Sequence, residues 1–418
     1  MISTETTVHR ASTTARNLLA ALADPEQVQF NPDSPPVRVR PQSLAGGAAG
    51  IALAHIQAAR VGHGPWATAR TWLTRVVNEP ITDHDNATLW LGAPAVGLLL
   101  ATASTEATPL RRERDMLHTR IVALTQRRLD AAQERIHDGE SPALAEFDLI
   151  EGLSGLALYH LHTHPDIDLT RRLLAYLVQL TRPLRDDSEQ RPGWWSTRSP
   201  RGVLSPDWPE GHLNLGMAHG IGAPLSVLSL ALLRGITVNG HTEAIERVCS
   251  VLDTWRQYGP TGEWWPYHLS RQQFLAGAAH GAPHQRPSWC YGTPGLARAQ
   301  QLAGLAMHDR ARQTTAIRAM ADCLRDAAQL NTLTETGLCH GWAGLLHCAW
   351  RINADAPGAP LDTDLNRVVE QLLNRLKKDH RQADPELLDG EAGTALALLT
   401  YAAGTGPGLP WDSCLALA

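Results

Sequence analysis

A short element of the form Gly-x-x-Gly, followed each time by an apolar run of helical length, recurs seven times in this chain of 418 residues. Repetition at this scale is typical of architectures in which one unit buries its apolar face only against its neighbours. Alanine replaces the second glycine in two copies, at Ala95 and Ala223. The copies begin at Gly47, Gly92, Gly152, Gly220, Gly292, Gly341 and Gly390.

Charge-bearing stretches with apolar residues at helical spacing, such as WATARTWLTRVV and LNRVVEQLLNRLKK, lie between the glycine elements. We interpret them as outer helices and the apolar runs as inner helices, and no strand pattern competes with either. A closed ring satisfies all seven apolar faces at once. The sequence therefore predicts an all-α fold of the α/α toroid class, with seven inner and seven outer helices in one domain over residues 1–418.

Two irregular segments lengthen the spacing between Gly152 and Gly292, around residues 187–215 and 258–289. Both are rich in proline, glycine and tryptophan, which is typical of loops. Two uses of the tryptophans stay open at this point. Exposed indoles would grip a peptide, whereas buried ones would only cap the fold.

Composition excludes several classes of function. A net charge of −5 without a basic cluster argues against a nucleic-acid partner. No apolar run approaches the roughly 18 residues of a membrane span, and the N-terminus does not resemble a secretory signal, so we expect no transmembrane segment and a cytoplasmic location. Six cysteines in such a chain are better explained as metal ligands or core residues than as a disulfide framework.

Three of the glycine turns differ from the others by carrying cysteine or histidine. The turns MAHG, WCYG and LCHG place His219, Cys290, Cys339 and His340 at equivalent positions of the repeat. Two thiolates and one imidazole suit a tetrahedral Zn²⁺ ion, and three protein ligands leave one position open, as in catalytic zinc sites. The remaining cysteines lie in expected helices or near the C-terminus and receive no function: Cys249, Cys323, Cys348 and Cys414.

Over essentially its whole length the sequence resembles the lanthionine synthetase C family. GMAHG, WCYGTPG and LCHGWAG resemble the signature turns of that family in order and rough separation, and EFDLIEGLSG resembles its aspartate-bearing third repeat. The resemblance implies that Cys290, Cys339 and His340 bind one Zn²⁺ ion. It also implies four catalytic-site residues, which are His219, Asp148, Arg286 and Tyr291.

The resemblance further implies a stand-alone class I lanthipeptide cyclase of lantibiotic biosynthesis. Such an enzyme adds peptide cysteine thiolates to dehydroalanine or dehydrobutyrine and forms lanthionine or methyllanthionine thioether rings. Its partners would be a dehydrated precursor peptide, with leader and core, and a separate dehydratase, in a complex that can assemble at a membrane. We expect His219 to donate the proton, Asp148 to orient it, Arg286 to hold the enolate oxygen, and Tyr291 to hydrogen-bond either partner.

Other functions remain open at this stage. A protein prenyltransferase β subunit also activates a peptide cysteine with zinc. The zinc ligands of that family resemble an aspartate, cysteine and histidine set, whereas the turns here supply two cysteines. A toroidal glycosidase would use Asp148 and Glu151 as paired carboxylates. Glutathione addition to dehydroamino acids retains the chemistry with another nucleophile, and a peptide-binding scaffold would hold a purely structural zinc. An open fourth coordination position favours an enzyme over the scaffold.

Overall fold

The computed structural model is mostly helical and divides into two compact units. Unit 1 comprises residues 1–121 and 333–413, and unit 2 comprises residues 122–332 and 414–418. This division does not test the expected single domain over residues 1–418, which stays a prediction. The described residues are 4–31, 35, 38–104, 110–164, 168–184, 187–279, 286–378 and 384–418.

Each of the seven glycine elements is followed by a helix, as predicted. In unit 1 these helices are α2 (Ala48–Arg60), α4 (Ala93–Ala103), α15 (Trp342–Ala354) and α17 (Glu391–Ala403). In unit 2 they are α7 (Leu153–Thr163), α9 (Gly222–Leu233) and α12 (Thr293–Ala306). Almost every residue of these helices is buried, which is typical of helices that are apolar all round.

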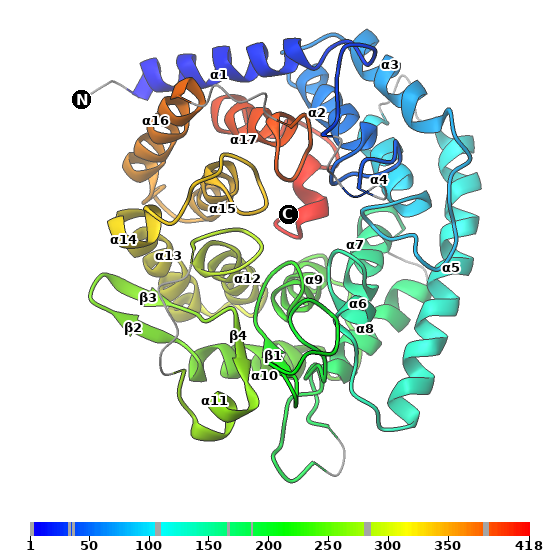
Figure 1. Cartoon of the computed structure of the whole chain (residues 1–418), viewed down its shortest axis with the longest axis vertical. Helices are drawn as coiled ribbons and strands as arrows, with labels where there is room; N and C mark the ends of the chain where they lie inside the picture. The colour runs from blue at the N-terminus through cyan, green and yellow to red at the C-terminus, as the bar shows by residue number, and fades with distance from the viewer. Residues whose placement is uncertain are drawn as a thin grey trace. The chain divides into compact units, whose positions relative to one another are not determined.

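The charge-bearing stretches form amphipathic helices that pack against this inner set. They are α1 (Thr4–Ala21), α3 (Trp66–Val77) and α16 (Asp362–Lys378) in unit 1, and α8 (Asp168–Leu180), α10 (His241–Thr254) and α13 (Arg310–Arg325) in unit 2. The long helix α5 (Arg111–His137) begins in unit 1 and ends in unit 2. Within unit 1, α1 lies along α17 and next to α16 (Figure 1).

Backbone hydrogen bonds join successive glycine turns within each unit. In unit 1 the N–H of Leu44 donates to the carbonyl of Trp90 at 2.9 Å, and the N–H of Leu388 donates to Ala45 at 3.0 Å. The N–H of Cys339 in turn donates to the carbonyl of Leu388 at 2.7 Å. Each accepting carbonyl belongs to the residue two positions before a turn glycine.

The same scheme holds in unit 2. The N–H of Leu149 donates to the carbonyl of Ala218 at 3.1 Å, and the N–H of Met217 donates to the carbonyl of Cys290 at 2.9 Å. Ala218 and Cys290 again stand two residues before a turn glycine, and so does Cys339 in unit 1. The hydrogen bonds therefore support the equivalence of the turn positions that the repeat predicted.

The two irregular segments contain short strands, which the sequence did not predict. Strand β1 (His212–Asn214) pairs antiparallel with β4 (His268–Ser270), and β2 (Gln257–Gly259) pairs antiparallel with β3 (Gly262–Trp264). Each strand has three residues, too few for an alternating pattern to stand out in the sequence. The short helices α6 (Leu144–Phe147), α11 (Arg271–Ala276) and α14 (Ala327–Leu330) and the 3₁₀ helix η1 (Trp411–Leu415) complete the elements.

Tryptophans of the inserted segments are mostly part of the core. Trp194, Trp195 and Trp265 are fully buried, and Trp265 donates from Nε1 to the carbonyl of Leu252 at 2.8 Å. These indoles cap the packed helices of unit 2 and are not available to grip a peptide. For these three residues the hypothesis of exposed peptide-binding tryptophans is wrong.

Within unit 1, a buried ion pair joins Asp412, at the start of η1, to α15. The carboxylate of Asp412 accepts hydrogen bonds from Nε and Nη2 of Arg351 at 2.5 and 2.6 Å and from Nε2 of His347 at 2.7 Å. Asp412 is fully buried, and the positive charge of Arg351 together with the hydrogen bonds from Arg351 and His347 holds its pKa far below the usual range despite the desolvation. Removing the charge would leave both partners uncompensated.

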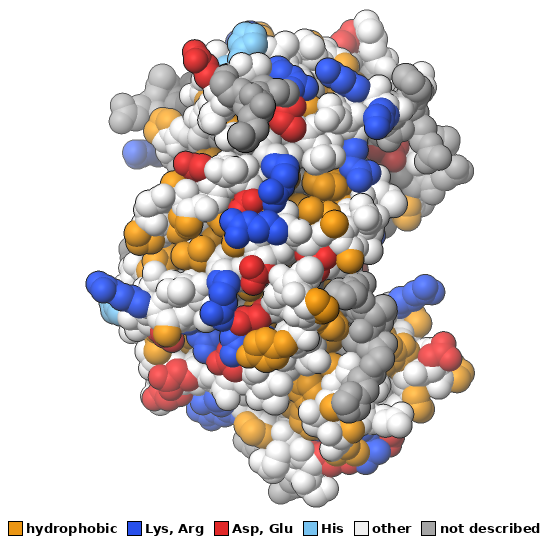
Figure 2. Space-filling model, turned by 90° about the vertical axis from the view of Figure 1, so that its left-hand side faces the viewer, with side chains coloured by type: hydrophobic (Ala, Val, Ile, Leu, Met, Phe, Trp, Pro, Cys, Tyr) orange, Lys and Arg blue, Asp and Glu red, His pale blue; other side chains and the backbone are white. Residues whose placement is uncertain are grey.

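On the face drawn in Figure 2, basic and acidic side chains are interspersed with apolar ones. Charged side chains of the described chain form local ion pairs, for example the pair between Arg318 and Glu263 at 2.5 Å. Among the described residues, no helix combines the length and apolar character needed to span a bilayer.

Candidate active site

The side chains of Asp148 and His219 meet in unit 2. Asp148 follows helix α6, and His219 lies in the turn that precedes α9. The Nδ1 atom of His219 lies 2.6 Å from Oδ2 of Asp148, and a carboxylate only accepts, so Nδ1 carries the proton. Nε2 is then the nitrogen that can serve a substrate.

Asp148 is held rigidly by the backbone of its own turn. Its Oδ1 accepts from the N–H groups of Glu151 at 2.6 Å and Gly152 at 2.9 Å, and the residue is only 1% exposed. With one oxygen bound to the backbone and the other to His219, the carboxylate is not placed to act as a nucleophile or acid. This arrangement disfavours the glycosidase hypothesis, which needs Asp148 and Glu151 as a free pair.

The imidazole of His219 has a raised pKa. Burial lowers the pKa, but the hydrogen bond to Asp148 and the negative charge of that carboxylate outweigh the burial and raise it above the usual 6.5. The side chain nevertheless keeps 37% of its surface exposed. A partly accessible imidazole with a raised pKa is suited to deliver a proton.

Cys290 lies in the turn before α12, and its main chain is bonded to the His219 turn. Its carbonyl accepts from the N–H groups of Met217 at 2.9 Å and Ala218 at 3.2 Å. The neighbouring Trp289 is buried and donates from Nε1 to the carbonyl of Leu415 at 3.1 Å. The buried Cys290 sulfur and the imidazole of His219 are therefore carried by two turns that cannot move independently.

Two details fix the shape of the Cys290 turn. The hydroxyl of Ser288 donates to the carbonyl of Tyr291 at 2.7 Å and lies 3.5 Å from the sulfur of Cys290. Gly292 has a φ of +96°, a conformation that other residues rarely adopt, and thereby directs the chain into α12. Glycine is therefore required at this end of the turn.

Tyr291 packs over the glycine that opens the His219 turn. A Cβ atom on Gly216 would lie 2.4 Å from the Tyr291 ring, so only glycine admits the ring here. The ring centroid lies 5.0 Å from that of Tyr267, and the Tyr291 hydroxyl lies 3.1 Å from Nδ2 of Asn214. Tyr291 thus belongs to a partly buried network that the sequence alone does not reveal.

Arg286 lies in unit 2 next to Tyr267. Its carbonyl accepts from the hydroxyl of Tyr267 at 2.7 Å. Its Nε atom is buried and has no hydrogen-bond partner among the described residues. An Nε–H of this kind, without an acceptor among the described residues, is one that an anionic or strongly polar group of a ligand would satisfy.

The other two predicted ligands, Cys339 and His340, lie side by side in unit 1. Cys339 is partly exposed, and its backbone is bonded to Leu388 as described above. Nε2 of His340 lies 2.6 Å from a carboxylate oxygen of Glu335, and Nδ1 lies 3.6 Å from Oδ1 of Asp389. One potential ligand atom from each of these three residues lies within 4.8 Å of the others.

This half of the predicted centre fits a zinc ion in its donor chemistry. A thiol and an imidazole are the donors that zinc prefers, and histidine ligands usually donate their second ring nitrogen to a carboxylate. Glu335 supplies that carboxylate. The second carboxylate near His340, Asp389, forms an ion pair with Arg38, which also pairs with Glu386. Asp389 could not be predicted from the sequence because only the fold brings it to the LCHG turn, and Glu335 stands near that turn without a pattern that marks it.

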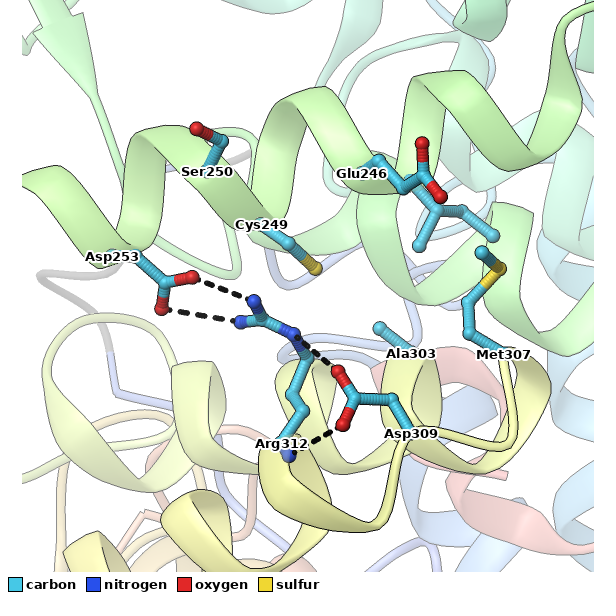
Figure 3. Close-up of a pocket in the computed structure, with 9 residues that line it drawn as sticks. Glu246, Cys249, Ser250, Asp253, Ala303, Met307, Asp309 and Arg312 are labelled. Atoms are coloured by element: carbon cyan, nitrogen blue, oxygen red, sulfur yellow. Dashed lines mark hydrogen bonds and ion pairs between the residues drawn. The ribbon is translucent and has the colours of Figure 1, made fainter.

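A separate cavity of about 310 Å³ lies in unit 2 between α10 and the segment from α12 to α13. Cys249 points toward it, and Arg312 pairs there with Asp253 and Asp309 (Figure 3). Burial raises the pKa of the Cys249 thiol to about 12, so it stays protonated and unreactive. Cys323 and Cys348 are buried in α13 and α15, and Cys414 is buried in η1.

Comparison with known proteins places these features in context. The family model of the lanthionine synthetase C-like protein matches residues 38–416. The nisin biosynthesis protein NisC of Lactococcus lactis subsp. lactis is 23% identical over 210 residues, a match that spans 48% of this chain and 48% of that relative.

A solved structure of a nisin cyclase superposes with a TM-score of 0.74 at 18% identity and covers 97% of each chain. At this identity the likeness speaks for the fold alone. It confirms the predicted fold class, an all-α fold of the α/α toroid type.

Proposed function

The chain belongs to the lanthionine synthetase C-like family, and we propose that it closes thioether rings in a dehydrated peptide. The thiol of a peptide cysteine adds to the β-carbon of dehydroalanine or dehydrobutyrine, and a carbon–sulfur bond forms as the double bond is lost. The electron pair moves toward the neighbouring carbonyl to give an enolate, which takes up a proton at the α-carbon. The product is an isomer of the substrate, since one proton leaves sulfur and one reaches carbon.

The observation that carries this proposal is the joining of the His219 turn to the Cys290 turn. Two backbone hydrogen bonds end on the carbonyl of Cys290, and they come from the two residues directly before His219. A residue able to donate a proton is thereby held next to a sulfur able to bind a metal. Conjugate addition of a thiol needs both functions in one place.

We propose that Cys290, Cys339 and His340 together hold one Zn²⁺ ion. The donor set of two sulfurs and one nitrogen, and the carboxylate of Glu335 on His340, support this assignment. When bound, zinc would deprotonate a peptide thiol at its open fourth position and keep the sulfur nucleophilic. Cys290 and Cys339 would serve the metal only, because neither is consumed in the addition.

His219 is the proposed proton donor to the α-carbon. Its Nδ1–H is bound to Asp148, so the proton is delivered from Nε2, and Asp148 stabilises the imidazolium that exists before delivery. The hydrogen bond to Asp148 and its negative charge raise the pKa of the ring and so favour its charged form. Arg286 and Tyr291 are proposed to hold the enolate oxygen, where negative charge develops as sulfur adds.

We further propose that the substrate is a precursor peptide already dehydrated by a separate dehydratase, and that the enzyme works in the cytoplasm, recruited to a membrane-associated complex. The resemblance of the signature turns supports these points. Glutathione as the nucleophile is the alternative that keeps the same residues. A scaffold with a purely structural zinc would leave the exposed imidazole of His219 and its bond to Asp148 without a task.

The deciding experiment incubates the purified chain with a synthetic peptide that carries one dehydroalanine and one cysteine. Samples with and without glutathione are alkylated at free thiols and analysed by mass spectrometry. Ring closure leaves the peptide mass unchanged and removes the alkylatable thiol, whereas glutathione addition increases the mass and preserves that thiol. A peptide that remains fully alkylatable at its original mass would refute both reactions.

The metal assignment has its own test. Cys290→Ala is expected to lose zinc, as measured by elemental analysis, together with ring closure. Cys249→Ala is the matched control, because Cys249 is another buried cysteine of unit 2 that has no role in the proposal. Full zinc content in Cys290→Ala would remove Cys290 from the ligand set.

A further inference from the structure

Asn214 lies at the end of strand β1, fully buried between His212 and Tyr291. The Oδ1 atom of its amide lies 3.0 Å from the backbone nitrogen of Gly216. A backbone N–H can only donate, so the atom that faces it must be the amide oxygen. The amide group therefore has one orientation, in which Nδ2 lies 3.1 Å from the hydroxyl oxygen of Tyr291.

His212 fixes the other side of the same amide. Its Nδ1 lies 2.8 Å from the carbonyl oxygen of Arg198, and a carbonyl only accepts, so Nδ1 carries the ring proton. Burial lowers the pKa of His212 to about 4, which keeps the ring neutral and leaves Nε2 as an acceptor. Nε2 lies 3.4 Å from Nδ2 of Asn214, a longer contact with the same direction of donation.

Two backbone groups of fixed polarity thus determine the tautomer of His212 and the orientation of the Asn214 amide. The amide of Asn214 must donate toward Tyr291, and the oxygen of Tyr291 must accept. The phenolic hydrogen consequently points away from Asn214. The ring itself cannot turn freely, because it rests on Gly216 and packs against Tyr267 and His268.

We propose that Asn214 is a positioning residue that makes the Tyr291 hydroxyl a hydrogen-bond donor to the reacting peptide, an inference that rests on the ring-closing function proposed above. Addition of sulfur builds negative charge on the carbonyl oxygen next to the α-carbon. A donor at Tyr291 stabilises that charge, whereas an acceptor would oppose it. The direction of one buried amide therefore decides whether Tyr291 helps or hinders the reaction.

Asn214→Asp tests this inference because it keeps the shape and reverses the polarity. A carboxylate only accepts, so the N–H of Gly216 retains its partner while Tyr291 must now donate to residue 214. We expect kcat for ring closure of the dehydroalanine–cysteine peptide to fall on the order of 10²-fold with little change in KM, as for loss of one oxyanion donor. Tyr291→Phe is expected to lose the same factor, and the double variant no more than either single one.

Asn353→Asp is the matched control, since Asn353 holds its amide in the same way. Its Oδ1 accepts from the N–H of Leu361 and its Nδ2 donates to Asp362, both at 2.7 Å, in unit 1. The control carries the cost of a buried carboxylate without touching Tyr291, so it should keep kcat. An unchanged kcat in Asn214→Asp, or losses that multiply in the double variant, would overturn the inference.

A spectroscopic readout separates this inference from the proposed function. The ultraviolet Raman doublet of tyrosine reports whether a phenol donates or accepts, and the difference between spectra with and without Tyr291 isolates that residue. We expect its signal to change from acceptor to donor toward residue 214 in Asn214→Asp. A signal that does not change refutes the inference, whether or not the wild-type chain closes rings.

Discussion

Asp148→Asn is the perturbation that most directly tests the assignment of His219 as proton donor. In the wild-type chain Oδ1 of Asp148 accepts two backbone hydrogen bonds, and Oδ2 accepts the Nδ1–H of His219. An asparagine must keep its oxygen on the two backbone donors, because the alternative would set its NH₂ group against both. The NH₂ group then faces Nδ1 of His219. Nδ1 therefore has to lose its proton and accept a hydrogen bond from the NH₂ group.

The size of the effect follows from the lost interaction. A hydrogen bond to a charged group contributes about 1.5–3 kcal/mol, and about 1.4 kcal/mol corresponds to one pKa unit. The imidazole of His219 keeps 37% of its surface exposed, so solvent screens part of this energy. The lower end of the range applies, and we expect the pKa of His219 to fall by about one unit in Asp148→Asn.

The sign of the pH dependence follows from the raised pKa of His219. The stabilisation by its charged form is complete below the unfolded pKa of about 6.5 and is lost as pH rises through the folded, higher pKa. Proton delivery by His219 fails over the same upper range. In Asp148→Asn the decline of the ring-closure rate should begin about one pH unit lower, and above the pKa of His219 the rate at a given pH should fall by up to about tenfold.

The assay is the rate of thiol loss from the dehydroalanine–cysteine peptide across pH, with zinc content measured in parallel. Asp130→Asn is the matched control, because Asp130 is an exposed carboxylate of unit 2 that pairs with Arg172. It should leave the pH profile unchanged. An Asp148→Asn variant whose rate declines at the wild-type pH would show that the His219–Asp148 pair does not set the proton transfer.

Three further outcomes are expected. His219→Ala should retain zinc by elemental analysis yet close rings on the order of 10²-fold more slowly, and unchanged turnover would exclude His219 from the mechanism. Gly216→Ala should lower the free energy of unfolding in urea by about 1–3 kcal/mol, because the new Cβ meets the ring of Tyr291 at 2.4 Å. Asp412→Asn should cost about 3–5 kcal/mol by uncovering Arg351 and His347, and the wild-type advantage in thermal melts should shrink as pH falls below about 4. If Gly216→Ala were as stable as the wild type, the described packing of Tyr291 on Gly216 would be contradicted. If Asp412→Asn were as stable as the wild type, the described ion pair would be contradicted.

The parts of the fold that the sequence predicted are those with a local signal. Each glycine turn and the apolar run behind it stand in one continuous stretch, and all seven stretches form helices. The strands of the inserted segments left no such signal, because β1 pairs with β4 across more than 50 residues and each has only three residues. The burial of Trp194, Trp195 and Trp265 likewise depends on packing against residues distant in the sequence. Composition therefore could not show whether these tryptophans cover the core or bind a peptide.

The candidate site divides along the same line. The cysteines and histidines of the three unusual turns, His219 included, are visible in the sequence, and the family resemblance added Asp148, Arg286 and Tyr291. No sequence motif indicates that the carboxylate of Glu335 or the amide of Asn214 belongs to the site. Asn214 reaches Tyr291 across 77 positions, and its importance lies in the direction of a hydrogen bond, which only the fold sets.

The position two residues before each turn glycine explains why chemistry can be added to this repeat without loss of the fold. At Trp90, Ala218, Cys290 and Leu388 the main-chain carbonyl of this residue accepts a hydrogen bond from the preceding turn, and at Ala45 it accepts one from the last turn of the chain. The structural task belongs to the main chain, so the side chain is free to be alanine, tryptophan, leucine or cysteine. A sulfur placed here is held by a backbone that the repeat already fixes. For this reason Cys290→Ala should lose its zinc while its helical circular dichroism at ambient temperature stays that of the wild type, and a collapse of the fold would show that the side chain carries a structural task too.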